Sequence, residues 1–144
     1  MKEQRIGIIM NGVTGRMGLN QHLVRSILAI RDEGGLALAD GSRLIPDPIL
    51  VGRNAAKLEQ IAKEHGVARW TTDLTKALSD PNDVIYFDAT LTATRAPNVE
   101  AAIKAKKHIY CEKPLAVDSA IAVDLAKKAK AAGIKAGVVQ DKLF

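Results

Sequence analysis

The chain has 144 residues, of which 47% are hydrophobic and 26% are charged, and this balance is typical of a globular domain rather than of a disordered chain. Its apolar runs are too short to span a bilayer, and its polar start lacks the long apolar region of a signal peptide, so we expect a cytoplasmic protein without a membrane partner. The formal net charge of +5 is dispersed along the chain and only 3% of the residues are aromatic, which argues against a nucleic-acid partner.

Strand-like and helix-like segments alternate from the start of the chain. Residues 5–10 form a short apolar run that predicts a strand buried on both faces of a sheet. Apolar residues then recur at helical spacing over 15–31, and the glycine pair at 34–35 provides a stop for this helix. Residues 32–48 contain glycines and two prolines, so we expect a long irregular connection there, with a short hairpin around 39–42.

The alternation continues to the end of the chain. The remaining predicted strands cover residues 48–51, 68–71, 84–89, 108–111 and 135–139, and the remaining predicted helices cover 55–65, 72–79, 95–106 and 117–132. Strands that alternate with helices are typical of a parallel sheet with right-handed crossovers. The sequence therefore predicts one α/β domain over residues 1–144, a doubly wound parallel sheet of the Rossmann type with about six strands and with helices on both faces.

A glycine-rich segment, Gly12-Val13-Thr14-Gly15-Arg16-Met17-Gly18, lies between the first predicted strand and the first predicted helix. This is the position of a phosphate-binding loop, where glycine lets the backbone approach a pyrophosphate and the helix start offers unpaired N–H groups. The alternative interpretation is a structural tight turn. Three glycines in register at this junction favour the phosphate-binding loop over that alternative. The spacing is one residue longer than G-x-G-x-x-G and resembles the loops of NADP-using proteins. The predicted cofactor contacts from this loop are Gly12, Thr14, Gly15, Arg16 and Met17.

The second predicted strand ends in Val51-Gly52-Arg53-Asn54. Proteins that prefer NAD usually place an acidic residue here to bind the ribose 2′-hydroxyl, whereas the planar guanidinium of Arg53 suits a 2′-phosphate. We therefore predict that Arg53 and Asn54 contact the cofactor and that NADP is favoured over NAD. In the alternative interpretation, Arg53 is an exposed loop residue and Asn54 caps the next helix, and Asn54 can serve both roles.

A charged pair followed by proline, Glu112-Lys113-Pro114, ends the strand predicted at 108–111. A lysine at the mouth of a cleft can donate hydrogen bonds to a substrate hydroxyl or carbonyl group. Three residues are a short motif, so a solvated surface pair remains an equally good interpretation from spacing alone.

These motifs together are similar to those of the Gfo/Idh/MocA oxidoreductases, and the resemblance extends over essentially the whole chain. It rests on the phosphate loop, on Asp88-Ala89-Thr90 and on the segment Lys107 to Pro114. Members of this family oxidise or reduce sugars, cyclitols and related polyols with a nicotinamide cofactor. The resemblance implies a catalytic Lys113 that contacts both nicotinamide and substrate, and Glu112 near the nicotinamide ribose. It further implies that Thr90, Leu91 and Thr92 line the cofactor crevice, and that Asp141 lies at this crevice after the sixth strand.

The resemblance also carries an expectation about what lies outside this domain. The family follows it with a sheet-rich domain that holds the general acid or base and most substrate contacts, so we expect this chain by itself to bind cofactor with negligible turnover. A full-length protein of this family is expected to be a homo-oligomer. The chain departs from the family pattern at Arg95, where a histidine is common, and at Lys106, where a glycine is common.

Other chemistry is less well supported by the sequence. The three histidines and the lone cysteine show no metal-ligand spacing, so we predict no metal site. Cys111 lies at a strand end without a positioned base and is expected to be inert packing. Two other functions remain open: a dihydrodipicolinate reductase-like enzyme, because Gly15-Arg16-Met17-Gly18 is similar to the phosphate loop of those enzymes, and a non-catalytic NADP-binding sensor or regulatory module.

Overall fold

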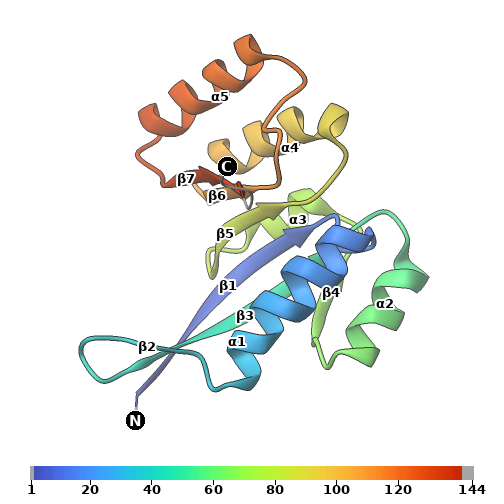
Figure 1. The fold of residues 1–144 in the computed structure, drawn as a ribbon, viewed down its shortest axis with the longest axis vertical. Helices are drawn as coiled ribbons and strands as arrows, with labels where there is room; N and C mark the ends of the chain where they lie inside the picture. Colours follow the sequence, from blue (N-terminus) through green and yellow to red (C-terminus); the bar gives the residue numbers. More distant parts are fainter. Residues whose placement is uncertain (1, 141–144) are drawn as a thin grey trace.

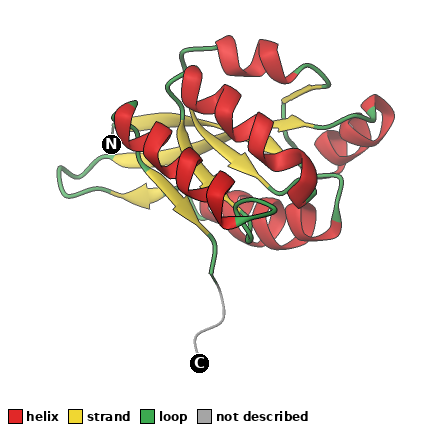
Figure 2. Ribbon diagram, turned by 90° about the horizontal axis from the view of Figure 1, so that it is seen from above, coloured by secondary structure: helices red, strands yellow, loops and turns green. Residues whose placement is uncertain are grey.

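A curved sheet with helices on both of its faces forms the centre of the computed structural model, which describes residues 2–140 (Figures 1 and 2). The strands are β1 (Glu3–Asn11), β2 (Leu36–Ala37), β3 (Arg43–Val51), β4 (Arg69–Thr71), β5 (Asp83–Asp88), β6 (His108–Cys111) and β7 (Ala136–Val138). The helices are η1 (Met17–Leu28), α1 (Ala29–Asp32), α2 (Ala55–Glu64), α3 (Leu74–Ser79), α4 (Thr92–Lys104) and α5 (Ser119–Ala131).

The strand order confirms the predicted doubly wound topology. The central path runs β3-β1-β5-β6-β7, with β4 paired to the outer side of β3, and all of these pairings are parallel. The chain thus moves from β1 outward to β3 and β4, and then returns to build β5, β6 and β7 on the other side of β1. The direction of winding changes between β1 and β5, which is where sheets of this kind bind their ligands.

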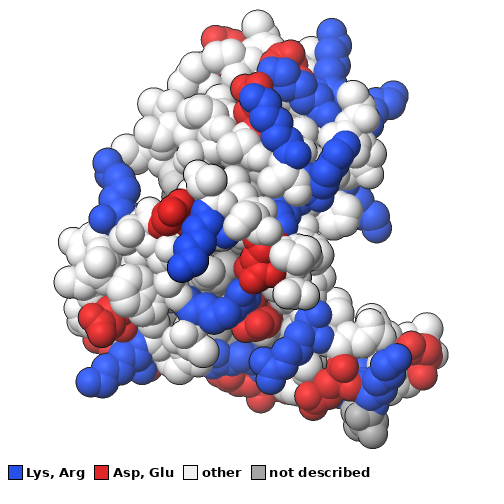
Figure 3. Space-filling view, turned by 180° about the vertical axis from the view of Figure 1, so that it is seen from behind, with Lys and Arg blue, Asp and Glu red and all other residues white. Residues whose placement is uncertain are grey.

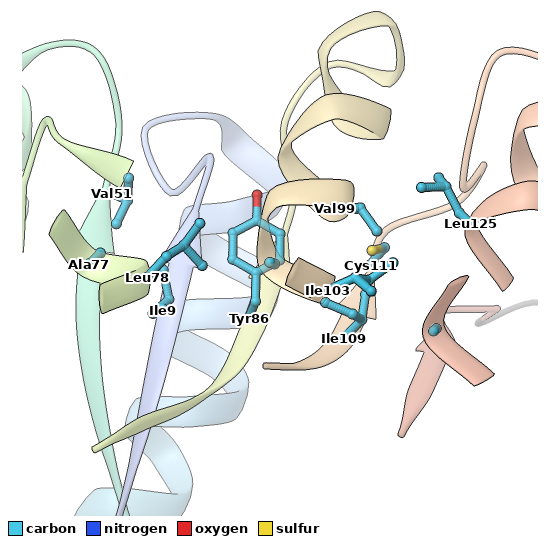
Figure 4. Close-up of a cluster of buried hydrophobic side chains, with 12 residues drawn as sticks. Ile9, Val51, Ala77, Leu78, Tyr86, Val99, Ile103, Ile109, Cys111 and Leu125 are labelled. Carbon is cyan, nitrogen blue, oxygen red and sulfur yellow. The ribbon is translucent and has the colours of Figure 1, made fainter. Parts of the chain in front are cut away.

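Both faces of the sheet are buried, and successive side chains alternate between two hydrophobic cores. Ile9 and Tyr86 point into the core beneath α3, α4 and α5, which Figure 4 shows, whereas Ile8 and Phe87 point into the core beneath η1 and α2. Because both faces are covered, the strands read as apolar runs rather than as alternating patterns. The prediction of helices on both faces is confirmed.

The first helix has the predicted extent but a wider form than an ordinary α-helix. Residues 17–28 form a π-helix, in which hydrogen bonds join residues five apart. Its buried residues, Gly18, Leu23 and Leu28, accordingly recur every five positions, and Ser26 donates its hydroxyl to the carbonyl of Gln21 at 2.9 Å. The short α1 then continues it to Asp32.

The connection predicted over 32–48 is more regular than expected. The predicted hairpin is confirmed, since the N–H of Leu38 donates to the carbonyl of Ser42 at 2.9 Å and β2 pairs antiparallel with β3. However, β3 begins at Arg43 rather than at Pro48, so the prediction of irregular structure up to Pro48 was wrong.

Pro46 and Pro48 misled the prediction because proline usually interrupts a sheet. The N–H of Arg43 points toward β1, where it donates to the carbonyl of Lys2 at 3.0 Å. Because N–H groups alternate sides along a strand, positions 46 and 48 face away from β1. The pairings with β2 and β4 on that other side involve residues 43–44 and 49–51, so the prolines occupy the stretch between them. Neither proline removes a donor that the sheet uses.

Basic and acidic side chains are interspersed on the face that Figure 3 shows, in agreement with the dispersed charge of the sequence. None of the helices between residues 2 and 140 combines the length and the hydropathy of a membrane-spanning segment.

Candidate functional site

A cleft of about 530 Å³ lies at the carboxyl ends of β1, β3 and β5, next to the switch in winding direction. Its volume is in the usual range for a small-molecule site. It is lined by Asn11, Gly12, Thr14, Gly15, Val51, Gly52, Arg53, Thr72, Leu74, Ala89, Thr90, Leu91, Thr94 and Asn98. Three of the predicted motifs therefore meet at one site: the glycine-rich loop, the end of β3 and the segment after β5.

Gly12 fixes the glycine-rich loop against two strand ends. Its N–H donates to the carbonyl of Val51 at 3.2 Å, and its φ is +91°. A Cβ at this position would lie 2.6 Å from the backbone carbon of Ala89. Only glycine can hold the loop in this conformation and at this distance from β5.

Gly15 belongs to the same loop, two residues before η1 begins. A Cβ there would meet nothing nearer than the carbonyl oxygen of Gly12 at 3.5 Å, so space for a ligand lies in that direction. Arg16 precedes η1 without capping it through its side chain, which leaves N–H groups of the first turn available to an anion. The loop therefore fits a pyrophosphate.

Replacing Gly15 by alanine tests this role directly. The new methyl group fits the fold, so we expect the free energy of unfolding to change by less than about 0.5 kcal/mol. The same methyl group points into the cleft, where it keeps a pyrophosphate from approaching the backbone, so the affinity for NADPH should fall about tenfold. Calorimetric titration together with urea unfolding measures both quantities, and unchanged affinity in a folded variant would contradict this role.

Arg53 and Asn54 follow β3 and have separate surroundings. Arg53 is exposed and lines the cleft. The Asn54 side chain accepts a hydrogen bond from the N–H of Lys57 at 3.0 Å and caps α2, so the alternative interpretation of Asn54 as a helix cap is confirmed. Asn54 is outside the cleft lining.

The segment after β5 is organised by the carboxylate of Asp88, which is fully buried. It accepts hydrogen bonds from the Tyr86 hydroxyl at 2.5 Å, from the Thr90 N–H at 2.8 Å and from the Thr90 hydroxyl at 2.7 Å. Asn11 completes the chain of contacts by donating to the Tyr86 oxygen at 3.0 Å. Burial and the nearby Asp88 charge raise the pKa of Tyr86 far above its usual value, so this hydroxyl stays protonated and donates.

Arg95 connects this segment to the one after β6. Its guanidinium donates to Asp88 Oδ1 at 3.1 Å, to the carbonyl of Thr90 at 2.6 Å and to the carbonyl of Glu112 at 2.8 Å, and it also donates to the carbonyl of Pro114. In the sequence, Arg95 departs from the histidine that is common in the family, and no role was predicted for it.

In the Glu112-Lys113-Pro114 segment, the Glu112 side chain is buried and the Lys113 side chain is exposed. Glu112 is 9% exposed and contacts the imidazole of His22 on η1, which packs against the ring of Phe87. Lys113 is exposed, and its peptide bond to Pro114 is cis. Since β6 neighbours β5, this segment lies one strand along the same edge of the sheet as the cleft.

The structure brings some of the predicted residues together in the cleft and places others around it. Gly12, Thr14, Gly15, Arg53, Thr90 and Leu91 line the cleft, whereas Arg16, Met17, Asn54, Thr92, Glu112 and Lys113 lie outside its lining. Asp141 falls outside the described residues.

Sequence reasoning missed several residues of the cleft. Thr94 and Asn98 are one turn apart on α4 and both line the cleft. The sequence predicted that this helix begins at residue 95, so Thr94 was left out of it, whereas α4 begins at Thr92. Asn11 directly precedes the glycine-rich segment and Ala89 lies inside Asp88-Ala89-Thr90, but neither was predicted as a contact. Thr72 follows β4 and Leu74 begins α3, and only the pairing of β4 with β3 places them here.

Cys111 is buried and has no place in this chemistry. Figure 4 shows it among Val99, Ile103 and Ile109 in the core beneath α4 and α5. Its burial confirms the predicted packing role, and this burial raises the pKa of the Cys111 thiol to about 12, which disfavours the reactive thiolate. Over residues 2–140, no three His, Cys, Asp or Glu side chains gather in a way that could hold a metal ion.

The amino-acid sequence of residues 35–140 matches the Gfo/Idh/MocA family model, which describes an oxidoreductase family with an NAD-binding Rossmann fold. Over 139 residues the chain is 51% identical to D-xylose dehydrogenase from Paenarthrobacter nicotinovorans, a match that covers 96% of this chain and 36% of that protein. Over 89 residues it is 32% identical to Myo-inositol 2-dehydrogenase from Thermotoga maritima, covering 60% of this chain and 27% of that protein.

A solved structure with the same fold supports this match. An NAD binding oxidoreductase from Klebsiella pneumoniae superimposes on 94% of this chain and 34% of its own with a TM-score of 0.76, at 28% sequence identity. The chain thus spans roughly a third, or less, of the length of the relatives that it matches.

Proposed function

Since this chain belongs to the Gfo/Idh/MocA oxidoreductase family and carries its NAD-binding Rossmann fold, we propose that the cleft binds NADP in preference to NAD. We further propose that the whole protein transfers a hydride between this cofactor and a sugar, cyclitol or related polyol. The observation that carries the cofactor assignment is Arg53, which lines the cleft at the end of β3 where an acidic residue would mark an NAD site.

The residues around the cleft fit the two ends of a dinucleotide. Gly12 and Gly15 line the part of the cleft where a pyrophosphate would lie, and Arg53 offers a planar pair of donors to a 2′-phosphate. The polar groups after β5, including the Thr90 hydroxyl, border the side that leads toward β6. The nicotinamide half would extend in that direction, over Glu112 and Lys113.

The nicotinamide ring supplies the hydride acceptor or donor when the cofactor is bound. The residues of this chain orient the reactants. With cofactor and substrate bound, the exposed Lys113 ammonium would donate a hydrogen bond to the substrate oxygen at the reacting carbon, and Glu112, which contacts His22, would hold the nicotinamide ribose. These two roles follow from the resemblance and from the position of the segment beside β5.

The 2′-phosphate assignment is tested by replacing Arg53 with alanine. A charge-assisted hydrogen bond contributes roughly 1.5 to 3 kcal/mol, so the affinity for NADPH should fall by about tenfold to hundredfold, whereas the affinity for NADH should change little. Titration of both nucleotides at one moderate salt concentration measures this. Lys63→Ala on α2 is the matched control, because it removes the same charge from a helix position outside the cleft lining. Equal affinity for NADH and NADPH in the wild type would overturn the NADP preference.

The substrate class rests on the family and on the identity shared with a D-xylose dehydrogenase. Reduction of NADP by the full-length protein in the presence of D-xylose, compared with myo-inositol, provides the first test. Binding of NADPH without turnover of any sugar or polyol would instead favour a sensor or regulatory module. The family assignment gives no support to the dihydrodipicolinate reductase alternative.

A further inference from the structure

We propose that Arg95 is a positioning residue that holds the two segments of the cofactor site beyond β5 and β6 in one arrangement, and that it acts on the nicotinamide half of the cofactor. This inference rests on the proposed function, because it concerns how the same site binds a dinucleotide. Arg95 lies on α4, and nothing in the family match assigns a role to it.

The contacts of Arg95 join parts of the chain that come from different strands. One guanidinium nitrogen donates to the carbonyl of Thr90 at 2.6 Å, just after β5, and another donates to the carbonyls of Glu112, at 2.8 Å, and Pro114, after β6. The third nitrogen donates to Asp88 Oδ1 at 3.1 Å. A single side chain thus fixes main-chain atoms on both sides of Lys113.

The position of Arg95 is costly for stability. The residue is only 2% exposed, and it lies in the first turn of α4, where the helix dipole disfavours a cation. Asp88 balances its charge, but a buried ion pair gives little net stability, because both groups lose their hydration. An arginine at this position therefore provides one thing that an apolar residue could not. It donates hydrogen bonds to the carbonyls of Thr90, Glu112 and Pro114.

The segment after β6 is also held by contacts that do not involve Arg95, and these contacts differ from those of Arg95. The N–H of Glu112 donates to the carbonyl of Asp88 at 2.8 Å, and the Glu112 carboxylate contacts His22. These contacts fix Glu112 itself. Arg95 also reaches the carbonyl of Pro114, beyond Lys113, so it limits where the exposed lysine can point.

The adenosine half of the cofactor meets different residues in the proposed arrangement. Gly12 and Gly15 follow β1 and Arg53 follows β3, whereas Glu112 and Lys113 follow β6 on the other side of β5, and none of the first three contacts the Arg95 guanidinium. Loss of the Arg95 contacts should therefore weaken the binding of a whole dinucleotide while leaving the binding of its adenosine 2′,5′-bisphosphate part unchanged. A general loss of stability would weaken both ligands together.

The experiment compares Arg95→Lys with the wild type in calorimetric titrations of NADPH and of adenosine 2′,5′-bisphosphate. Lysine keeps the charge beside Asp88, but its one nitrogen cannot reach both segments. Misplacement of a binding group by about 1 Å can cost as much as a hundredfold, and we expect about a tenfold loss for NADPH with no change for the bisphosphate. Arg43→Lys is the matched control, since Arg43 also donates to main-chain carbonyls, those of Glu33, Gly34 and Gly35, but lies away from the cleft.

Equal loss for both ligands, or no loss for either, would overturn the inference about Arg95. If Arg95→Lys does not fold, the double variant Asp88→Asn with Arg95→Gln removes both buried charges, and the same two titrations apply. Wild-type protein that binds the bisphosphate but not NADPH overturns the inference and leaves the 2′-phosphate site intact. Wild-type protein that binds neither overturns the proposed function itself.

Discussion

Replacing Gly12 by alanine should destabilise the protein by about 3 kcal/mol and remove measurable cofactor binding. The substitution combines two costs, because φ is +91° at this position and the added Cβ would lie 2.6 Å from the Ala89 backbone carbon and 2.7 Å from the Thr90 nitrogen. These neighbours are main-chain atoms of the segment that directly follows β5, so they cannot rotate away as a side chain could. Relief requires the glycine-rich loop to separate from β5, and this separation opens the cleft where the pyrophosphate would lie.

Urea unfolding followed by titration with NADPH measures both parts of this prediction. Gly15→Ala provides the contrast within the same loop, since its methyl group has space in the fold and its effect is confined to the ligand. A Gly12→Ala variant with wild-type stability and affinity would show that the loop is less tightly held than the hydrogen bond from Gly12 to Val51 indicates.

The order of strands and helices could be predicted from the sequence because each βα unit carries its own local pattern. Buried parallel strands appear in the sequence as apolar runs. The helices end at recognisable residues such as Gly133, which follows α5 and has a φ of +70°. The start of β3 could not be predicted, because it depends on which side of the strand Pro46 and Pro48 face. That side is set by pairing with β1, which is a property of the assembled sheet.

In the candidate site, too, some residues could be predicted from the sequence and others could not. The glycine-rich loop and Arg53 could be found because their chemistry follows from residue type and from position after a strand. The contacts of Arg95 could not, because they join a helix to the ends of two strands, and residues 95 and 114 come together only in the folded chain. His22 beside Glu112 was missed for the same reason, since the two residues are 90 positions apart.

An ion pair between the half-buried Arg69 and the buried Asp83, near the amino end of β5, gives the second large effect. Asp83 is 1% exposed at the start of β5, and its two carboxylate oxygens accept hydrogen bonds from Arg69 of β4 at 2.8 and 3.0 Å. Arg69 also donates to the main-chain carbonyl of Asp47 at 2.7 Å. Gly7 of β1 makes room for this pair, because a Cβ there would lie 2.2 Å from Asp83 Oδ1.

Replacing Arg69 by methionine should lower the free energy of unfolding by about 3 kcal/mol, since it leaves the Asp83 carboxylate buried without its cation. Methionine keeps an unbranched apolar stem in place of the arginine stem, so the loss reports the charge and its hydrogen bonds more than packing. Urea unfolding with an unchanged dependence on denaturant concentration would assign the effect to the native state. Arg31→Met is the matched control, because the Arg31 side chain is 26% exposed, against 29% for Arg69, and pairs with an Asp32 side chain that is 65% exposed. A surface pair of this kind contributes at most about 1 kcal/mol.

The double variant Arg69→Met with Asp83→Asn separates the pair from its surroundings. Asparagine keeps the shape beside Gly7 and removes the charge that methionine leaves unpaired, so the double variant should be more stable than Arg69→Met alone. The coupling in the resulting cycle should be about 1 to 3 kcal/mol, as for residues in direct contact. Strict additivity of the two single effects would mean that Arg69 stabilises the sheet through its stem and the Asp47 carbonyl rather than through Asp83. In that case Gly7 would be required for close strand approach alone, and the ion pair would contribute no stability to the sheet.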